Sequence, residues 1–341
     1  MQQDFAGVSG GYSAVVGCLA VGQSGMTPSR RPVPIALGLI RHRLPAIVIG
    51  AILVLGGNRA ATANDLASSD ASPSAPFVVY CHDSDRDVVD RVLASLCHGE
   101  VVTEDEAKAI RERRSQYIAH VLHFDQRSGP EGMELARIGT AFFVDETARL
   151  LTNNHIVDEC KAVTVGVRGQ KPLAATVLAT DVKNDLALLG VAGEAHAVAV
   201  FDSGESAGAF AAIVGYPDQG LTPLEPVVSA GTLLRGNNDM TVDGNIFFKA
   251  DVRRGNSGGP IFDSHGSVIG IVKAKVDTVR TYRATNREID DTGVGIALSV
   301  VLDFLRRNNA LYRVEKRDIA IGPDQILAEA DSFVVRAECW K

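Results

Sequence analysis

The sequence predicts a mainly β protein through the central part of the chain. Glycine is abundant, with 33 among the 341 residues, and short runs of Val, Ile, Leu and Ala recur between turn residues. The regular alternation of strands with helices of ~12 residues, which a parallel sheet requires, is missing. At about 100–200 residues per domain, the length fits one unit with extensions or two domains. The net charge of -7 and the lack of a dense basic face argue against a nucleic-acid partner.

Residues 1–63 are typical of a secretory leader. Arg41–Arg43 form a basic flank, Leu44–Gly57 an apolar core and Ala61–Ala63 an A-x-A cleavage site. The apolar core is shorter than the ~20 residues that span a bilayer, so we expect only transient contact with the membrane. The mature protein would then be periplasmic or secreted, and an uncleaved leader that anchors the chain is the alternative. Met26 is a plausible true start.

A linker and a small N-terminal extension are expected after the leader. Residues 64–76 are rich in Ser, Asp, Ala and Pro, which predicts a flexible linker. Apolar residues at helical spacing within Val88–Leu96 predict a first helix. Thr103 and Glu106 form a capping box that opens a second helix. We therefore expect a helical extension over residues 77–125, which either packs beside the main domain or acts as an inhibitory prosegment or partner-docking surface.

Four cysteines remain once the leader is removed, and an even number in an exported protein favours disulfides. Cys81 and Cys97 lie in one small segment and are the preferred pair, which leaves Cys160 to pair with Cys339. Four cysteines allow three connectivities. Each of the first two is followed by a histidine, a pattern that raises the question of zinc. Adjacent residues rarely both face one ion, and C-x-x-C spacing is absent, so no metal is expected.

Ser257 is the leading candidate for a nucleophile. It stands among glycines in Gly255–Gly259, between two apolar runs. A hydroxyl is a poor nucleophile, so a catalytic serine needs a base and a pocket of N–H donors. Gly255 can adopt backbone angles that aim its N–H and that of Ser257 at one oxygen. The same letters also fit the G-x-S-x-G turn of α/β-hydrolases.

His155 and Asp185 are the candidate base and its partner. His155 directly follows an apolar strand and a polar turn, and Asp185 opens the apolar run Leu186–Leu189. A carboxylate that enters a buried strand is costly unless a partner such as an imidazole N–H satisfies it. A structural histidine and a solvent-facing turn are the alternative interpretations. The chain order His, Asp, Ser excludes the α/β-hydrolases, in which the histidine follows the serine, and His265 is too close to Ser257 to fold back.

Three segments together resemble the signature motifs of the trypsin-like serine proteases, and they are closest to the Htr/Deg branch. They are Thr152–Val157, Asp181–Leu189 and Gly255–Pro260. The resemblance implies an all-β fold of two antiparallel six-stranded β-barrels, with the site in the cleft between them. It assigns residues 126–310 to the protease domain. Residues 311–341 remain as a C-terminal tail that we expect to be too short for the PDZ domain usual in that branch.

The resemblance also implies a role for each matching residue. His155 would take the Ser257 proton and return it to the leaving amine, while Asp185 holds the imidazole tautomer. The N–H groups of Gly255 and Ser257 would receive the oxyanion. Asn256 stands where digestive trypsins carry an aspartate that pairs with a newly cut N-terminus. Activation by such a cut is therefore not expected, and neither is a cofactor.

Two interpretations of specificity follow from the resemblance. Asp251 stands where digestive trypsins place the base of the specificity pocket, and a carboxylate there would favour Arg or Lys in the substrate. Lys273 or Lys275 on the next strand could neutralise it, which would favour small or medium apolar side chains. Arg253 and Arg254 would be solvated charges on the cleft rim or would select acidic substrates.

The function expected from the sequence is that of an exported serine endopeptidase, with proteins or peptides as substrates. A catalytically silent homologue that acts as a protein-binding module is the alternative. A glutamate-specific endopeptidase on the same fold is a third possibility that differs only in substrate preference. The intact set of His155, Asp185 and Ser257 favours the enzyme, because a silent relative has usually lost one member.

Overall fold

The computed structural model describes most of the chain after residue 77. The described ranges are residues 78–124, 129–167, 171–203, 209–217, 225–234 and 241–341. The leader and the linker predicted for residues 1–63 and 64–76 lie outside them. Asp70–Lys341 form one compact unit. Among the described helices, none combines the length and the apolar character needed to cross a membrane.

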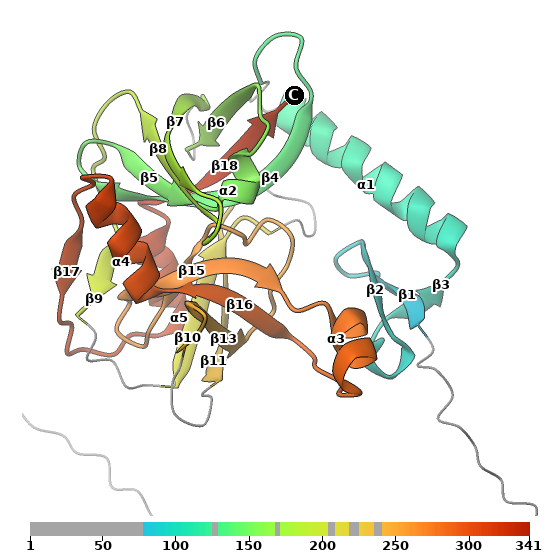
Figure 1. Ribbon diagram of the computed structural model, residues 1–341. Helices are drawn as coiled ribbons and strands as arrows, with labels where there is room; N and C mark the ends of the chain where they lie inside the picture. Colours follow the sequence, from blue (N-terminus) through green and yellow to red (C-terminus); the bar gives the residue numbers. More distant parts are fainter. Residues whose placement is uncertain (1–77, 125–128, 168–170, 204–208, 218–224, 235–240) are drawn as a thin grey trace, which may run out of the picture. The chain divides into compact units, whose positions relative to one another are not determined.

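Six antiparallel strands close the first barrel (Figure 1). Their order around the barrel is β18-β4-β5-β8-β7-β6. The strands are β4 (Leu135–Asp145), β5 (Arg149–Thr152), β6 (Ala162–Gly166), β7 (Leu173–Asp181), β8 (Leu186–Val191) and β18 (Val334–Trp340).

The second barrel also closes with six antiparallel strands, because β13 and β15 both pair with β16. The ring runs β13-β11-β10-β14-β15-β16 and returns to β13. The strands are β10 (Phe210–Gly215), β11 (Val227–Leu234), β13 (Asn245–Lys249), β14 (Pro260–Phe262), β15 (Val268–Lys275) and β16 (Thr292–Ala297). The expected pair of six-stranded barrels is confirmed.

Short elements decorate the barrels. They are β9 (Val200–Asp202), β12 (Thr241–Val242), β17 (Arg313–Glu315), α2 (Asn154–Val157), α3 (Thr278–Thr285), α4 (Leu298–Arg307) and α5 (Pro323–Ala330). One buried apolar cluster contains residues of both barrels, among them Phe142, Leu151, Val214 and Phe262. Close packing of this kind is rigid, so it fixes the two barrels relative to each other.

The C-terminal segment is part of the first barrel, which corrects the predicted tail over residues 311–341 and the domain end at residue 310. Strand β18 lies between β4 and β6 and pairs with both, and all seven of its residues are buried. Within it, Arg336 and Glu338 form a buried ion pair, and Glu338 also accepts a hydrogen bond from Thr164 Oγ1 (2.6 Å). The Cys160–Cys339 disulfide ties this strand to the chain beside β6.

The N-terminal extension is a small sheet followed by one helix. Its strands β1 (Val78–Asp83), β2 (Val88–Leu93) and β3 (Glu100–Val102) have the order β2-β1-β3, and the Cys81–Cys97 disulfide lies within it. Both disulfides match the pairing that the sequence favours.

The helix predicted within Val88–Leu96 is wrong, because Val88–Leu93 form a strand paired with β1 and Ala94–Leu96 form only a 3-10 turn. Short apolar runs do not separate helix from strand by spacing alone, and β-branched valines favour the strand. The second predicted helix is confirmed as α1 (Glu104–Phe124). Its capping box forms as expected, since Thr103 N donates to Glu106 Oε2 (2.8 Å) and Glu106 N donates to Thr103 Oγ1 (3.3 Å).

Candidate active site

His155 and Asp185 meet at one end of the first barrel. His155 lies in α2 just after β5, and Asp185 directly precedes β8, the antiparallel neighbour of β5. The ring Nδ1 of His155 lies 2.8 Å from Asp185 Oδ2, and the backbone N–H of His155 donates to Oδ1 (2.9 Å). A carboxylate only accepts, so the imidazole carries its proton on Nδ1 and leaves Nε2 free as a base.

The backbone holds Asp185 in place for this contact. Its φ of 60° lies in the left-handed region, which aspartate tolerates better than most residues. The carbonyl oxygen of Asp185 accepts hydrogen bonds from Asn153 Nδ2 (2.9 Å) and from Asn154 N (3.2 Å). The side chain of Asp185 is 15% exposed, whereas that of His155 is 45% exposed. The carboxylate is therefore sheltered behind an imidazole that opens onto the cleft.

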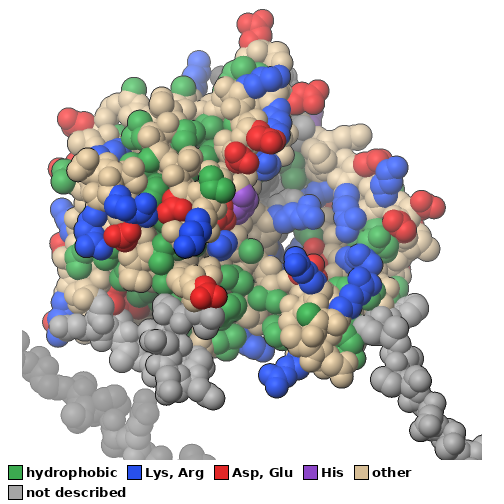
Figure 2. Space-filling model, in the orientation of Figure 1, with side chains coloured by type: hydrophobic (Ala, Val, Ile, Leu, Met, Phe, Trp, Pro, Cys, Tyr) green, Lys and Arg blue, Asp and Glu red, His purple; other side chains and the backbone are tan. Residues whose placement is uncertain are grey.

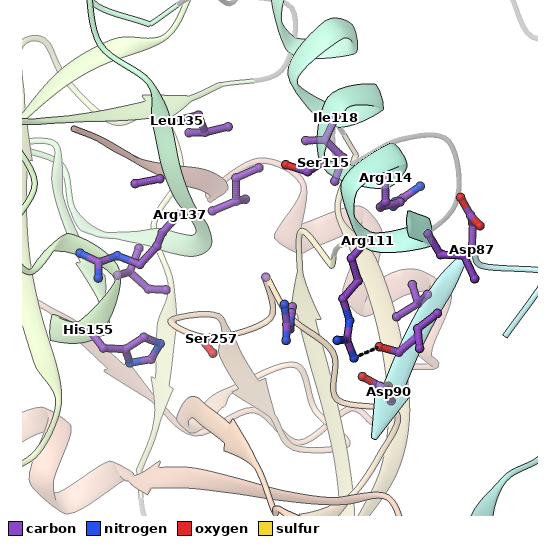
Figure 3. A pocket seen from close by; sticks show the side chains of 18 residues that line it. Asp87, Asp90, Arg111, Arg114, Ser115, Ile118, Leu135, Arg137, His155 and Ser257 are labelled. Carbon is purple, nitrogen blue, oxygen red and sulfur yellow. Dashed lines mark hydrogen bonds between the residues drawn. The ribbon is translucent and has the colours of Figure 1, made fainter. Parts of the chain in front are cut away.

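Ser257 lies across the cleft, in the turn before β14. Figure 3 shows Ser257 opposite His155 in one pocket. The Ser257 hydroxyl donates to the carbonyl oxygen of Lys273 (3.2 Å), and within the described residues no hydrogen bond joins it to His155. All three predicted residues line a cavity of about 1320 Å³. Free enzymes often show loose catalytic hydrogen bonds that tighten only with substrate, so this hydroxyl position is compatible with catalysis.

The loop around Ser257 leaves two N–H groups free. Among the described residues, neither Gly255 N nor Ser257 N donates a hydrogen bond to the protein. Gly255 adopts φ 92°, and its carbonyl oxygen accepts from Thr140 Oγ1 of the first barrel (2.6 Å). Gly258 adopts φ 86°, and a Cβ there would lie 2.1 Å from the Thr140 carbonyl oxygen. The loop can therefore approach the first barrel this closely only with glycine at position 258.

Asn256 anchors the same loop through its buried side chain. Its side chain is buried, and its Oδ1 accepts the backbone N–H of Arg253 (2.8 Å). The backbone N–H of Asn256 donates to the Arg253 carbonyl oxygen (3.1 Å), which closes a turn over Arg254 and Gly255. A neutral amide satisfied in this way needs no counter-charge in its buried site.

Asp251 lines the larger cavity, but its carboxylate is already paired. Arg253 contacts both oxygens, with Nε 2.9 Å from Oδ1, and Arg86 of the extension lies 3.2 Å from Oδ2. Burial opposes ionisation of Asp251. The hydrogen bond and charge of Arg253, with the charges of Arg86 and Lys275, outweigh burial and hold its pKa below the usual value. The sequence interpretation considered Lys273 and Lys275 as neutralising groups and missed the two arginines.

Lys273 contributes both its backbone carbonyl and its side chain to the site. Its carbonyl oxygen accepts from Ser257, and its side chain lines the larger cavity with Asp251. Lys275 borders the same cavity and is paired with Asp291 (3.2 Å). The described residues contain no group of three or more His, Cys, Asp or Glu side chains arranged to hold a metal ion.

Part of the chain is similar to known serine proteases. Residues 139–271 match the family model described as trypsin-like peptidase domain. An uncharacterized protein of Sinorhizobium fredii, y4bJ, is 36% identical over 62% of this chain and 34% of its own length. A probable periplasmic serine endoprotease DegP-like of Marinomonas is 29% identical over 43% of this chain and 32% of its own length.

Among solved structures, an HtrA-type protease, AlgW, with a decapeptide aligns with a TM-score of 0.41 and 22% identity, over 50% of this chain and 51% of that one. The chain thus spans about a third of the length of these curated relatives.

Proposed function

We propose that this chain is an exported serine endopeptidase. Residues 139–271 match the trypsin-like peptidase domain, and DegP-like serine proteases are among the relatives of the chain. The main support for this proposal is that His155 contacts Asp185 and that both residues line one cavity together with Ser257. The chain matches only about a third of the length of these relatives, so activity and substrates are inferred from the site. Two disulfides and the periplasmic relatives support an oxidising compartment outside the cytoplasm.

The reaction begins when Ser257 leaves the Lys273 carbonyl and turns its hydroxyl toward His155. Nε2 of His155 takes the hydroxyl proton as Oγ attacks the substrate carbonyl carbon. Asp185 stabilises the imidazolium through the Nδ1 hydrogen bond. The imidazolium then gives its proton to the leaving amine, which breaks the peptide bond and leaves an acyl ester on Ser257. Water, deprotonated by the same imidazole, hydrolyses the ester.

The free N–H groups of Gly255 and Ser257 receive the negative oxygen of the tetrahedral intermediate. They are held by a loop fixed to Thr140, so they need no rearrangement when charge develops. Loss of one such donor typically lowers the rate by about 10²–10³.

The pairing of Asp251 supports small or medium apolar side chains before the scissile bond. A basic substrate side chain would have to displace Arg253 or Arg86 from the carboxylate, which already has cationic partners. Asp251 then holds Arg253 in the wall of the subsite, and Lys273 lines the same cavity.

A cleavage assay tests the proposed function. The mature protein, starting at Asn64, is incubated with an unfolded protein and a peptide library, and new N-termini are identified by mass spectrometry. We expect cleavage after small or medium apolar residues, and none with Ser257→Ala. A silent binding homologue would give the same intact substrates with both proteins, even where binding is measurable.

A further inference from the structure

The N-terminal extension reaches the cleft through polar contacts at three places. Arg86 pairs with Asp251, Ser95 Oγ donates to Glu288 Oε1 (2.8 Å), and His98 lies 3.9 Å from Asp290. Figure 1 shows its sheet beside α3, with α1 running from it toward β4. A core of Val89, Ala107 and Ile110 and the Cys81–Cys97 disulfide hold sheet and helix together.

Two cavities meet at Ser257, and the extension lines both of them. The first, of about 1320 Å³, contains Asp251 and Lys273, and the second, of about 470 Å³, extends under α1. Val88 and Asp90 of β2, together with His155, Arg254 and Ser257, border both cavities. With 45% of its side chain exposed, His155 remains open to solvent. The extension therefore walls the cleft without plugging it.

A peptide that passes the nucleophile must occupy both cavities. Given the proposed function, on which this inference rests, the cavity with Asp251 and Lys273 takes the acyl half of the substrate. The smaller cavity is lined by His155 and Gly255 but not by Asp251. It then takes the half of the substrate that leaves with the amine. It thus holds the residues on the C-terminal side of the scissile bond.

The smaller cavity has an excess of positive charge. Its charged lining residues are Arg111, Arg114, Arg137 and Arg254 against Asp87 and Asp90. Burial opposes ionisation of Asp87, but hydrogen bonds from Arg113 and His82 outweigh it and hold its pKa below the usual value. The carboxylate of Asp87 is paired with Arg113 (2.7 Å), which does not line the smaller cavity. In Figure 2, Lys and Arg side chains gather along the hollow between the extension and the barrels.

Two of the arginines are placed to meet a substrate side chain. Arg254 directly precedes Gly255, is exposed, and has no hydrogen bond or ion pair with any described residue. Arg111 is held by a hydrogen bond to the Val89 carbonyl oxygen (3.1 Å) and lies over the Tyr80 ring. Figure 3 shows Arg111 reaching from α1 into the pocket that Ser257 faces. A fixed cation on one wall and a free one on the other suit a carboxylate between them.

We propose that the extension forms the second wall of the substrate cleft and that Arg111 and Arg254 select acidic side chains just after the scissile bond. The preference is electrostatic and partly solvent-exposed. It should therefore be modest and should weaken as salt screens the charges.

Quenched fluorogenic peptides that differ only in the two positions after the cleavage site test this proposal on the mature, full-length protein. We expect kcat/KM for Glu to exceed that for Gln by about 2- to 5-fold, and Lys to be cleaved more slowly than Gln. The Glu-to-Gln ratio should fall toward one in Arg254→Gln and in Arg111→Gln, and also at high salt. Lys108→Gln removes an equal charge from the same helix outside the cavity and should leave the ratio unchanged.

The outcomes separate this inference from the proposed function. Equal cleavage of the Glu, Gln and Lys peptides would overturn the inference and leave the peptidase standing. Absence of cleavage of every peptide, with no labelling of Ser257 by a serine-reactive probe, would overturn the peptidase itself. Activity that appears only when Arg86→Ala releases Asp251, equally for all three peptides, would show an inhibitory cover instead of a substrate wall.

Discussion

Replacement of Asp185 by Asn is expected to lower kcat/KM by about 10⁴ while the protein stays folded. An amide keeps the shape of the carboxylate, but its NH₂ group would face Nδ1 of His155, which donates a hydrogen bond in the wild type. The imidazole would then have to expose N–H to Ser257, and Nε2 could not accept the hydroxyl proton. Steady-state hydrolysis of a peptide substrate measures the loss, and a thermal melt checks the fold.

Asp181→Asn is the matched control for this change. Asp181 lies in the same segment, but its carboxylate binds Asn184 (2.8 Å) and Arg307 (3.1 Å) and does not contact His155. We expect the control to retain activity close to that of the wild type. Full activity in Asp185→Asn would instead mean that the carboxylate does not orient the base.

Removal of residues 332–341 is expected to unfold the first barrel and abolish activity, although His155, Asp185 and Ser257 all remain. The deletion exposes the backbone edges of β4 and β6, which now pair with β18. It also removes Cys339 from its disulfide and Glu338 from Thr164. Together these losses are on the order of the whole 5–15 kcal/mol by which a domain is stable.

Circular dichroism, limited proteolysis and peptide hydrolysis follow this outcome. A double variant with Cys160→Ala and Cys339→Ala distinguishes the contribution of the disulfide from that of the paired strand β18. It should lose about 2–4 kcal/mol of stability and keep its fold and activity at room temperature. A truncated protein that melts cooperatively near the wild-type temperature would show that β18 is dispensable.

Local patterns predicted the parts of the fold that depend on neighbouring residues. The helix α1 and the capping box at Thr103 that opens it follow from side-chain type over a few residues. The same holds for the segments that carry His155 and Ser257, because each motif is contiguous. Their convergence came from the resemblance, since no local pattern encodes it.

Features that depend on distant partners could not be predicted. Strand β18 pairs with β4, whose residues lie almost two hundred positions earlier in the chain, and nothing near Val334 indicates that partner. The contact of Arg86 with Asp251 likewise joins two residues that lie far apart in the sequence. The helix predicted at Val88 was wrong for a similar reason. Its apolar residues have helical spacing, but the segment forms a strand because it pairs with β1.

Catalysis by this protein requires that the imidazole of His155, held by Asp185, activates the hydroxyl of Ser257. Reaction of the folded mature protein with a fluorophosphonate, followed by intact mass measurement and peptide mapping, tests it most directly. We expect one adduct per chain, located on Ser257, and we expect it to form much more slowly in His155→Ala. An adduct on another serine, or no adduct on a correctly folded protein, would contradict it.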